Sequence, residues 1–301
     1  MPGAGAVRDG QGARRLTRTI GGAKSSALAS ARVWGDHYRM GWDDYFAEDA
    51  GGIEAETRGK SRTLTVGWTV KWDGAGGAIW APPKAFSRSD PPARSGKSVQ
   101  VCPAAVDFDR RHFVIPCPVD LELAFVRNAQ GELTLTDKSG EKSAMRPQGR
   151  ANLFQIQPPG EWRHPERPII QFTAPYVFVA DEPCFVVQTP PYLHWFAEQR
   201  PGMQMGGRFP IHIWPRPLAW AFEWYDLSKP LKLKRGDPWF YVHFETENPS
   251  ARVRLVEQEM TGELTQYLNS IIDVSNYVNQ TYGLFAQAQR ARPGKLLKPK
   301  G

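Results

Sequence analysis

The chain from Pro168 to Asn248 decides the fold, and it ends in Leu231-Lys232-Leu233-Lys234-Arg235-Gly236-Asp237-Pro238 followed by Trp239-Phe240-Tyr241-Val242-His243-Phe244. Short apolar runs, each closed by proline, fill this stretch. Proline inside a central strand would remove a ladder hydrogen bond, so prolines between the runs mark strand ends. We therefore predict a mainly β protein, a jelly-roll or β-clip-like sandwich with its core at residues 99–250 and a long C-terminal α-helix.

Alternating or continuous apolar runs locate the individual strands of this core and of the segment before it, residues 34–98, which also carries an aromatic cluster and a proline-rich loop. The predicted strands are Thr63–Trp72, Ala78–Ala81, Val99–Cys102, Arg111–Ile115, Val119–Phe125, Leu133–Leu135, Leu153–Ile156, Ile169–Phe172, Tyr176–Val179, Cys184–Gln188, Phe209–Trp214, Leu218–Tyr225, Leu231–Leu233 and Trp239–Glu245.

The composition changes after Ser250, and residues 251–291 contain no proline, which predicts one amphipathic helix that ends before Pro293-Gly294. Residues recur there at alternating steps of four and three, as in a heptad repeat, with the polar Thr281 in one slot; the apolar ones are Met260, Leu264, Tyr267, Ile271, Val274, Val278 and Phe285. Two interpretations remain open. The stripe packs on the chain's own sandwich, or it joins copies into a homo-oligomer.

The net charge is +7, and much of the excess lies in a leader at 1–33 and a tail at 292–301. We expect both ends to be disordered and basic, and either to solubilise the chain or to contact an acidic partner. No window approaches the length of an apolar membrane span, so we predict none. Three cysteines without a CxxC spacing argue against a disulfide framework or a zinc knuckle.

Histidine and carboxylate side chains give one metal candidate. A jelly-roll can hold a divalent ion between imidazoles and a carboxylate on adjacent strands. The best set is His194, Glu198 and His243, with His212 as a spare. It would define a cupin-like, metal-dependent enzyme acting on a small molecule. The alternative is that these imidazoles fill strand positions. Asp107 and Asp109, which we expect on one side of a strand or in a charged turn, are a second and weaker candidate.

Aromatic side chains give the other candidate site, because flat rings exposed on a sheet bind sugars or nucleic-acid bases. The densest set is Tyr192, Trp195, Trp214, Trp220, Trp224 and Trp239. Packed inside the protein, the same rings are core. Catalytic triads, P-loops and dinucleotide fingerprints are absent, so no residue is singled out as catalytic.

Three groups of residues between Cys102 and Glu245 resemble a domain family of unknown function from phages and environmental bacteria. They are Cys102–Asp107 with Pro116–Leu121, Phe172–Phe178 with Val187–Pro191, and the basic run into Gly236–Phe240. The resemblance implies a shared sandwich and no activity. The last strands also resemble the β-clip fold of nucleotide diphosphatases, but the Asp-bearing strand of those enzymes has no match here.

The function that we predict from these features is a non-enzymatic binding or assembly module of phage or prophage origin. We expect it to self-associate or dock through its C-terminal helix. The N-terminus lacks the apolar core of a secretory signal, which predicts a cytoplasmic or virion-associated protein. The cupin-like enzyme and an aromatic platform for carbohydrate or nucleic acid are the alternatives.

Overall fold

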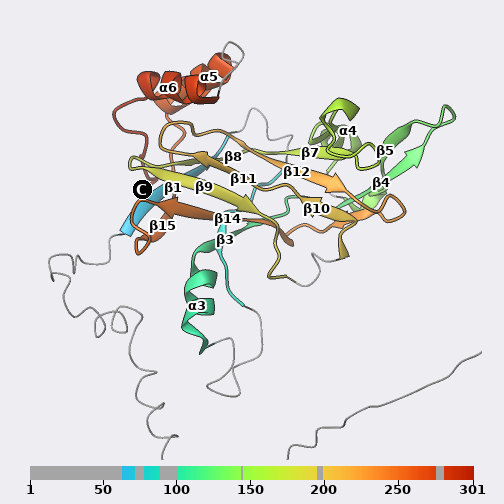
Figure 1. Cartoon of the computed structure of the whole chain (residues 1–301), viewed down its shortest axis with the longest axis horizontal. Coiled ribbons are helices and arrows are strands. Elements are labelled where there is room, and N and C mark those ends of the chain that lie inside the picture. The colour runs from blue at the N-terminus through green and yellow to red at the C-terminus, as the bar shows by residue number, and fades with distance from the viewer. Residues whose placement is uncertain (1–62, 72–77, 89–100, 144, 195–198, 276–280) are drawn as a thin grey trace, which may run out of the picture. The chain divides into compact units, whose positions relative to one another are not determined.

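The structure, a computed structural model, describes residues 63–71, 78–88, 101–143, 145–194, 199–275 and 281–301. The chain divides into two units, Met1–Thr57 and Arg58–Gly301, and every described residue belongs to the second. The described part contains four sheets and few helices, so the prediction of a mainly β protein is confirmed (Figure 1). The predicted leader at 1–33 and most of the segment 34–98 lie outside the described residues.

The largest sheet has five strands in the order β11-β9-β14-β3-β2. Their bounds are Gly207–Pro210, Cys184–Thr189, Pro238–Thr246, His112–Pro116 and Lys84–Ala85. Side chains alternate across a strand. Phe240, Val242 and Phe244 of β14 therefore enter the main core, while Tyr241 and His243 lie on the opposite face.

A four-stranded sheet in the order β10-β12-β7-β6 packs its aromatic face into the same core. Its strands are Gly202–Gln204, Leu218–Trp224, Ile169–Ala174 and Phe154–Ile156. Trp220, Phe222 and Trp224 alternate along β12 and are fully buried. Gly202 pairs opposite Trp224, where a Cβ would lie 2.0 Å from the carbonyl oxygen of Glu223, so the close strand approach requires glycine.

Two three-stranded sheets complete the β structure. One has the order β13-β4-β5, with bounds Leu231–Leu233, Leu121–Arg127 and Leu133–Asp137. The other has the order β15-β1-β8, with bounds Arg252–Glu257, Thr63–Val70 and Tyr176–Val179. Strands β8 and β13 have the predicted bounds, because an apolar run closed by a turn residue fixes both ends.

The prediction of one long C-terminal helix over 251–291 is not confirmed. Residues 252–257 form β15, which pairs parallel with β1. The helix α5 begins at Gly262 and ends at Ser275, and α6 runs from Thr281 to Ala291. Val253 and Leu255 alternate with charged residues and pack against the main core, so strand pairing outweighs the helical preference that we read there.

The described residues of the heptad stripe pack against other elements of the same chain. Leu264, Tyr267 and Ile271 of α5 are buried together with Leu268, Ala288 of α6 and two valines of β8. Met260 packs beside them, and Phe285 contacts the ring of Trp214. Figure 1 shows the two helices side by side over the strands. The side chain of Val274 and the whole of Val278 lie outside the described residues.

The tail at 292–301 is ordered and folded onto the body, so the expectation of a disordered basic end is wrong there. Leu296 is buried, and Arg292 donates hydrogen bonds to the carbonyl oxygens of His212 and Asp181. Lys298 and Lys300 form ion pairs with Glu259 and Glu257. These acidic partners belong to the same chain, and β15 and the turn after it position them.

Shorter elements correct other predictions. Pro103–Arg110 form the helix α3, which the sequence reading missed although proline suits the first turn of a helix. Strand β11 ends at Pro210 instead of reaching Trp214, and Ala78–Ala81 form no strand. The remaining elements are η3 (Gly140–Lys142), α4 (Pro147–Ala151) and η4 (Pro159–Glu161).

Within the described ranges, no helix combines the length and apolar character that crossing a membrane requires.

Candidate functional site

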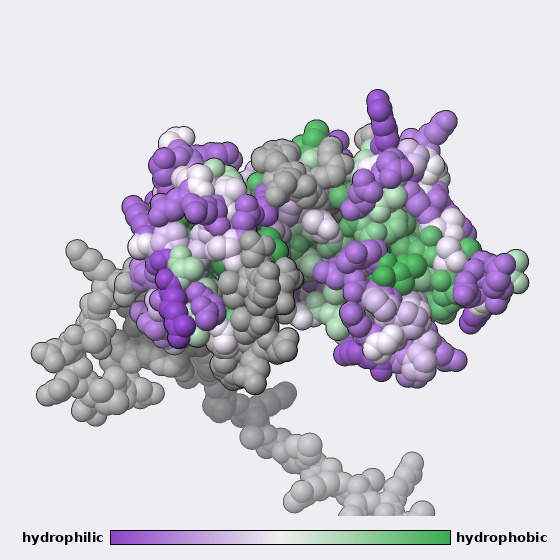
Figure 2. All heavy atoms as spheres, turned by 90° about the horizontal axis from the view of Figure 1, so that it is seen from above, coloured by the Kyte–Doolittle hydropathy of each residue, from purple (hydrophilic) through white to green (hydrophobic). Residues whose placement is uncertain are grey.

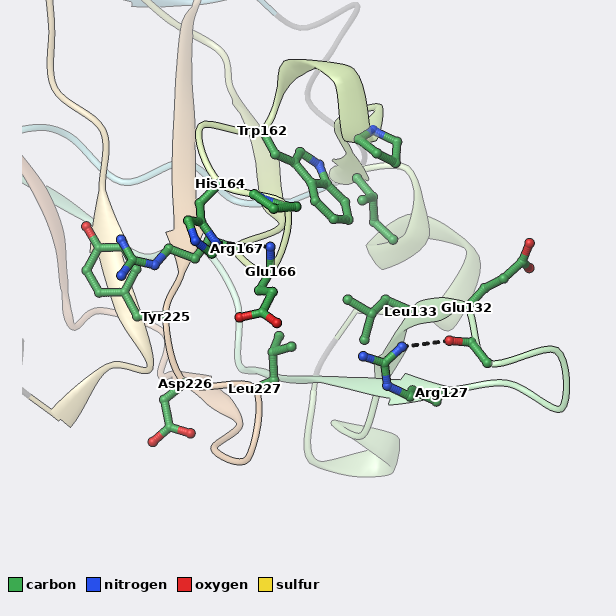
Figure 3. A pocket seen from close by; sticks show the side chains of 14 residues that line it. Arg127, Glu132, Leu133, Trp162, His164, Glu166, Arg167, Tyr225, Asp226 and Leu227 are labelled. Atoms are coloured by element: carbon green, nitrogen blue, oxygen red, sulfur yellow. Dashed lines mark hydrogen bonds between the residues drawn. The ribbon is translucent and has the colours of Figure 1, made fainter.

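A surface cleft of about 1020 Å³ lies at the end of the body that carries β4 and β5 (Figure 3). Three segments form its walls: the β4–β5 hairpin, the connection from β6 to β7, and the turn after β12. The lining residues are Arg127, Gly131, Glu132, Leu133, Ile156, Pro159, Trp162, His164, Pro165, Glu166, Arg167, Tyr225, Asp226 and Leu227. We call this feature the β4–β12 cleft.

Trp162 forms one aromatic wall of the β4–β12 cleft, and its ring is fixed. The indole Nε1 donates a hydrogen bond of 2.8 Å to the carbonyl oxygen of Gln157. The next residue, Arg163, pairs with Glu223, a β12 carboxylate that is only 1% exposed. This ion pair fastens the connection to β12, and it satisfies a buried charge that would otherwise be costly.

Tyr225 forms a second aromatic wall and is 43% exposed. The guanidinium of Arg167 lies 5.1 Å from the centre of the Tyr225 ring, which is a cation–π contact. Beside them, Asp226 accepts hydrogen bonds from the backbone N–H and the hydroxyl of Ser228. The Ser228 hydroxyl, followed by Lys229, holds the pKa of Asp226 below its ordinary value, so this carboxylate stays ionised and oriented.

The hairpin wall is rigid for local reasons. Asn128 Oδ1 accepts the backbone N–H groups of Gln130 and Glu132, which is the turn role typical of asparagine. Gly131 has a φ of 82°, a conformation that glycine tolerates best. Arg127 donates 2.7 Å to the carbonyl oxygen of Gly131, drawn as the dashed line in Figure 3.

Groups of both charge signs surround an apolar centre. Leu133 and Leu227 point toward the middle of the cleft in Figure 3, together with the carboxylate of Glu166. His164 Nδ1 accepts the backbone N–H of Glu166, so its Nε2 carries the ring proton as a donor. Figure 2 shows hydrophobic side chains gathered among hydrophilic ones on the side that carries β4, β5 and α4.

The predicted metal set of His194, Glu198 and His243 is described only in part, and its spare, His212, lies apart from His194. His212 Nδ1 contacts the backbone of Cys184, at the start of β9, while His194 Nδ1 contacts the hydroxyl of Tyr241, which pairs with Thr189 at the end of β9. At about 3.4 Å per residue, these two ends lie about 17 Å apart, too far to share one ion. Glu198 lies outside the described residues. No group of three or more His, Cys, Asp or Glu within the described ranges is placed to hold a metal.

His243 has a neighbour that the sequence did not suggest. It pairs directly opposite His112 of β3, and the two ring centres are 5.1 Å apart. Burial lowers the pKa of His112, His194 and His243 below the ordinary value. His112 was one of six histidines in the sequence, but only the strand register brings it to His243.

The predicted aromatic platform is mostly core. Trp220, Trp224 and Trp239 are at most 1% exposed, because β12 and β14 turn these faces inward. Trp214 is partly buried against Phe209 and Phe285. Tyr192 is exposed on another face, and Trp195 lies outside the described residues. The two aromatic rings of the β4–β12 cleft are Trp162, which is partly buried and was not predicted as a site residue, and Tyr225, which is exposed and was predicted as the end of a strand beside the aromatic set.

Asp107 and Asp109 lie on α3 instead of a strand. Asp107 pairs with Arg111, and Asp109 receives two hydrogen bonds from Arg88. These contacts agree with a structural role.

The buried thiols, Cys117 and Cys184, are unreactive near neutral pH. Burial raises the pKa of Cys117 and of Cys184 to about 12, so neither is a thiolate near neutral pH.

Comparison with known protein families and with curated proteins finds no match for this chain. The resemblance to a phage and bacterial domain family therefore stays a prediction.

Proposed function

We propose that this chain is a non-enzymatic binding module and that its ligand is a carbohydrate chain held in the β4–β12 cleft. The observation that carries the proposal is the placement of two aromatic rings, the partly buried Trp162 and the exposed Tyr225, in one cleft with fixed polar groups. Flat rings cover the apolar faces of a ligand, and a few oriented polar groups give it direction.

The charges of the cleft favour a neutral polyhydroxylated ligand over a nucleic acid. Arg127, Arg167 and His164 are donors, whereas the carboxylates of Glu132, Glu166 and Asp226 are acceptors. Sugar hydroxyls use both kinds of group. A phosphate chain needs a groove of positive charge, and the acidic residues that line the cleft would repel it.

A direct comparison of ligand classes tests this choice. Purified full-length chain is applied to immobilised oligosaccharides of glucose, galactose, mannose and N-acetylglucosamine, and in parallel to single-stranded DNA. We expect retention on at least one oligosaccharide that survives moderate salt. Retention on DNA alone, abolished by salt, would favour the nucleic-acid alternative instead.

Other parts of the prediction remain proposals with less support. They are the jelly-roll or β-clip-like class, the phage or prophage origin, the cytoplasmic or virion-associated location, and an acidic partner for the N-terminal basic leader. The burial of Leu264, Tyr267 and Ile271 favours docking of the C-terminal helices on their own body over self-association. The separation of His194 from His212 along β9 removes only the spare ligand of the cupin-like alternative, which remains a proposal for His194, Glu198 and His243.

A further inference from the structure

The outer face of the five-stranded sheet carries two histidines from neighbouring strands. His112 of β3 and His243 of β14 are directly opposite in antiparallel register. Side chains at such positions have Cβ atoms about 4.5–5.5 Å apart and point to the same face. The pair lies away from the β4–β12 cleft, whose lining residues come from other strands and loops.

His112 already has the hydrogen bonds of a metal-binding imidazole. Its Nδ1 donates a hydrogen bond of 2.8 Å to the carbonyl oxygen of Phe108 on α3. In a neutral ring this leaves Nε2 with a lone pair, and the hydroxyl of Tyr192 donates to it at 3.1 Å. Histidine ligands of metals usually donate their other nitrogen to a carbonyl or a carboxylate in this way.

His243 contributes a buried nitrogen that has no partner. Among the described residues, no hydrogen-bond partner is found for its Nδ1, nor for Oγ1 of Thr189, which pairs opposite Tyr241. Tyr241 and His243 share a face, and Thr189 lies on that face too. Buried polar atoms almost always have a partner, so two such atoms together point to a species that binds there.

The ring separation suits one shared ion. Zinc–nitrogen bonds are about 2.0–2.1 Å long, so an ion bound by both imidazoles would lie about 3 Å from each ring centre. An ion at that distance from both ring centres, which are 5.1 Å apart, would subtend an angle of about 115° between them, near the tetrahedral value. We propose that His112 and His243 form a cross-strand pair that binds a divalent transition-metal ion of the class that prefers imidazole, such as Zn²⁺ or Cu²⁺.

Binding requires the hydroxyl of Tyr192 to leave Nε2 of His112. Tyr192 is 48% exposed and follows the end of β9, so its side chain has room to turn aside. Because no third His, Cys, Asp or Glu among the described residues completes the set, water or the Tyr192 oxygen fills the remaining positions. The ion is therefore held exchangeably.

Calorimetric titration of metal-free, tag-free full-length protein with Zn²⁺ tests the site. His243→Gln and His112→Gln should each weaken binding about tenfold or more, since each removes one ligand. His164→Gln removes an exposed histidine of the cleft and should leave affinity unchanged. Mg²⁺, which prefers oxygen ligands, should give no heat.

The partly exposed His243 makes His243→Gln the decisive variant, because a fully buried position such as His112 can fail to fold when changed. Thermal melts check that each variant is folded. An electron paramagnetic resonance spectrum of the unaltered protein with bound Cu²⁺ supplies an independent readout. We expect hyperfine coupling of the copper to two imidazole nitrogens. Absence of Zn²⁺ binding, or equal affinity in folded His243→Gln protein, would overturn the proposal.

Discussion

Asp181 anchors the C-terminal end of the chain through Leu296. Asp181 Oδ1 accepts the backbone N–H of Leu296 at 2.7 Å and that of Leu297 at 3.2 Å. Asp181 lies between β8 and β9, and Arg292 approaches the same oxygen at 3.7 Å. One carboxylate therefore ties the tail to the strands on which α5 packs.

Replacement of this carboxylate tests the anchored tail. Asp181→Ala removes the acceptor of two backbone N–H groups, and a hydrogen bond to a charged group is worth about 1.5–3 kcal/mol. We expect the free energy of unfolding in urea to fall by about 2–3 kcal/mol. Glu161→Ala, at an exposed position in η4, is the control and should change it little. Equal stability of the two variants would mean that the tail is not held.

Shortening one side chain of the heptad stripe distinguishes packing of the C-terminal helices on their own body from self-association. Leu264 is 2% exposed within the chain, so Leu264→Ala should lower the free energy of unfolding by about 2–5 kcal/mol. Mass in solution, measured by light scattering, should stay that of the unaltered protein. A lower mass with unchanged stability would show instead that the stripe joins copies. Ile272→Ala, at a residue 43% exposed on α5, is the matched control.

Thiol chemistry follows burial. Cys102 is exposed, whereas Cys117 and Cys184 are buried. We expect a disulfide reagent at mildly alkaline pH to label Cys102 in the native protein, and the other two thiols only after unfolding. Rapid labelling of all three thiols without denaturant would contradict the burial of Cys117 and Cys184.

The raised thiol pKa values also predict a pH dependence of stability. In the unfolded chain a thiol ionises near 9.0, and burial raises the pKa to about 12 for Cys117 and Cys184. The folded state keeps its protons longer, so this contribution is complete below pH 9 and is lost as pH rises toward 12. Cys117→Ala should flatten that alkaline fall when unfolding is followed by urea titration at several pH values. An equally steep fall in the variant would exclude the thiol as its cause.

The sequence predicts the strands well where proline closes an apolar run, as for β8 and β13. It fails where pairing partners decide the outcome. Val253 and Leu255 fit a helix or a strand, and only the parallel contact with β1 selects the strand. The inward direction of the tryptophans on β12 follows from which face of its sheet packs into the main core, which is long-range information.

The two candidate sites could not be predicted from the sequence because each depends on which strands are neighbours. Trp162 and Tyr225 are far apart in sequence and line one cleft only because β6, β7 and β12 are neighbours in one sheet. The pairing of His112 with His243 depends on the register of β3 against β14, which no spacing along the chain encodes.

The most direct test of the central proposal is calorimetric titration of the chain with the oligosaccharide that it retains best. Trp162→Ala and Tyr225→Ala each remove one aromatic wall of the β4–β12 cleft. Phe108→Ala removes an aromatic ring on α3 that is 44% exposed and outside the cleft. We expect both cleft variants to lose binding while they keep the melting temperature of a folded protein, and Phe108→Ala to bind like the unaltered chain. Unchanged affinity in folded Trp162→Ala and Tyr225→Ala would contradict the carbohydrate-binding cleft.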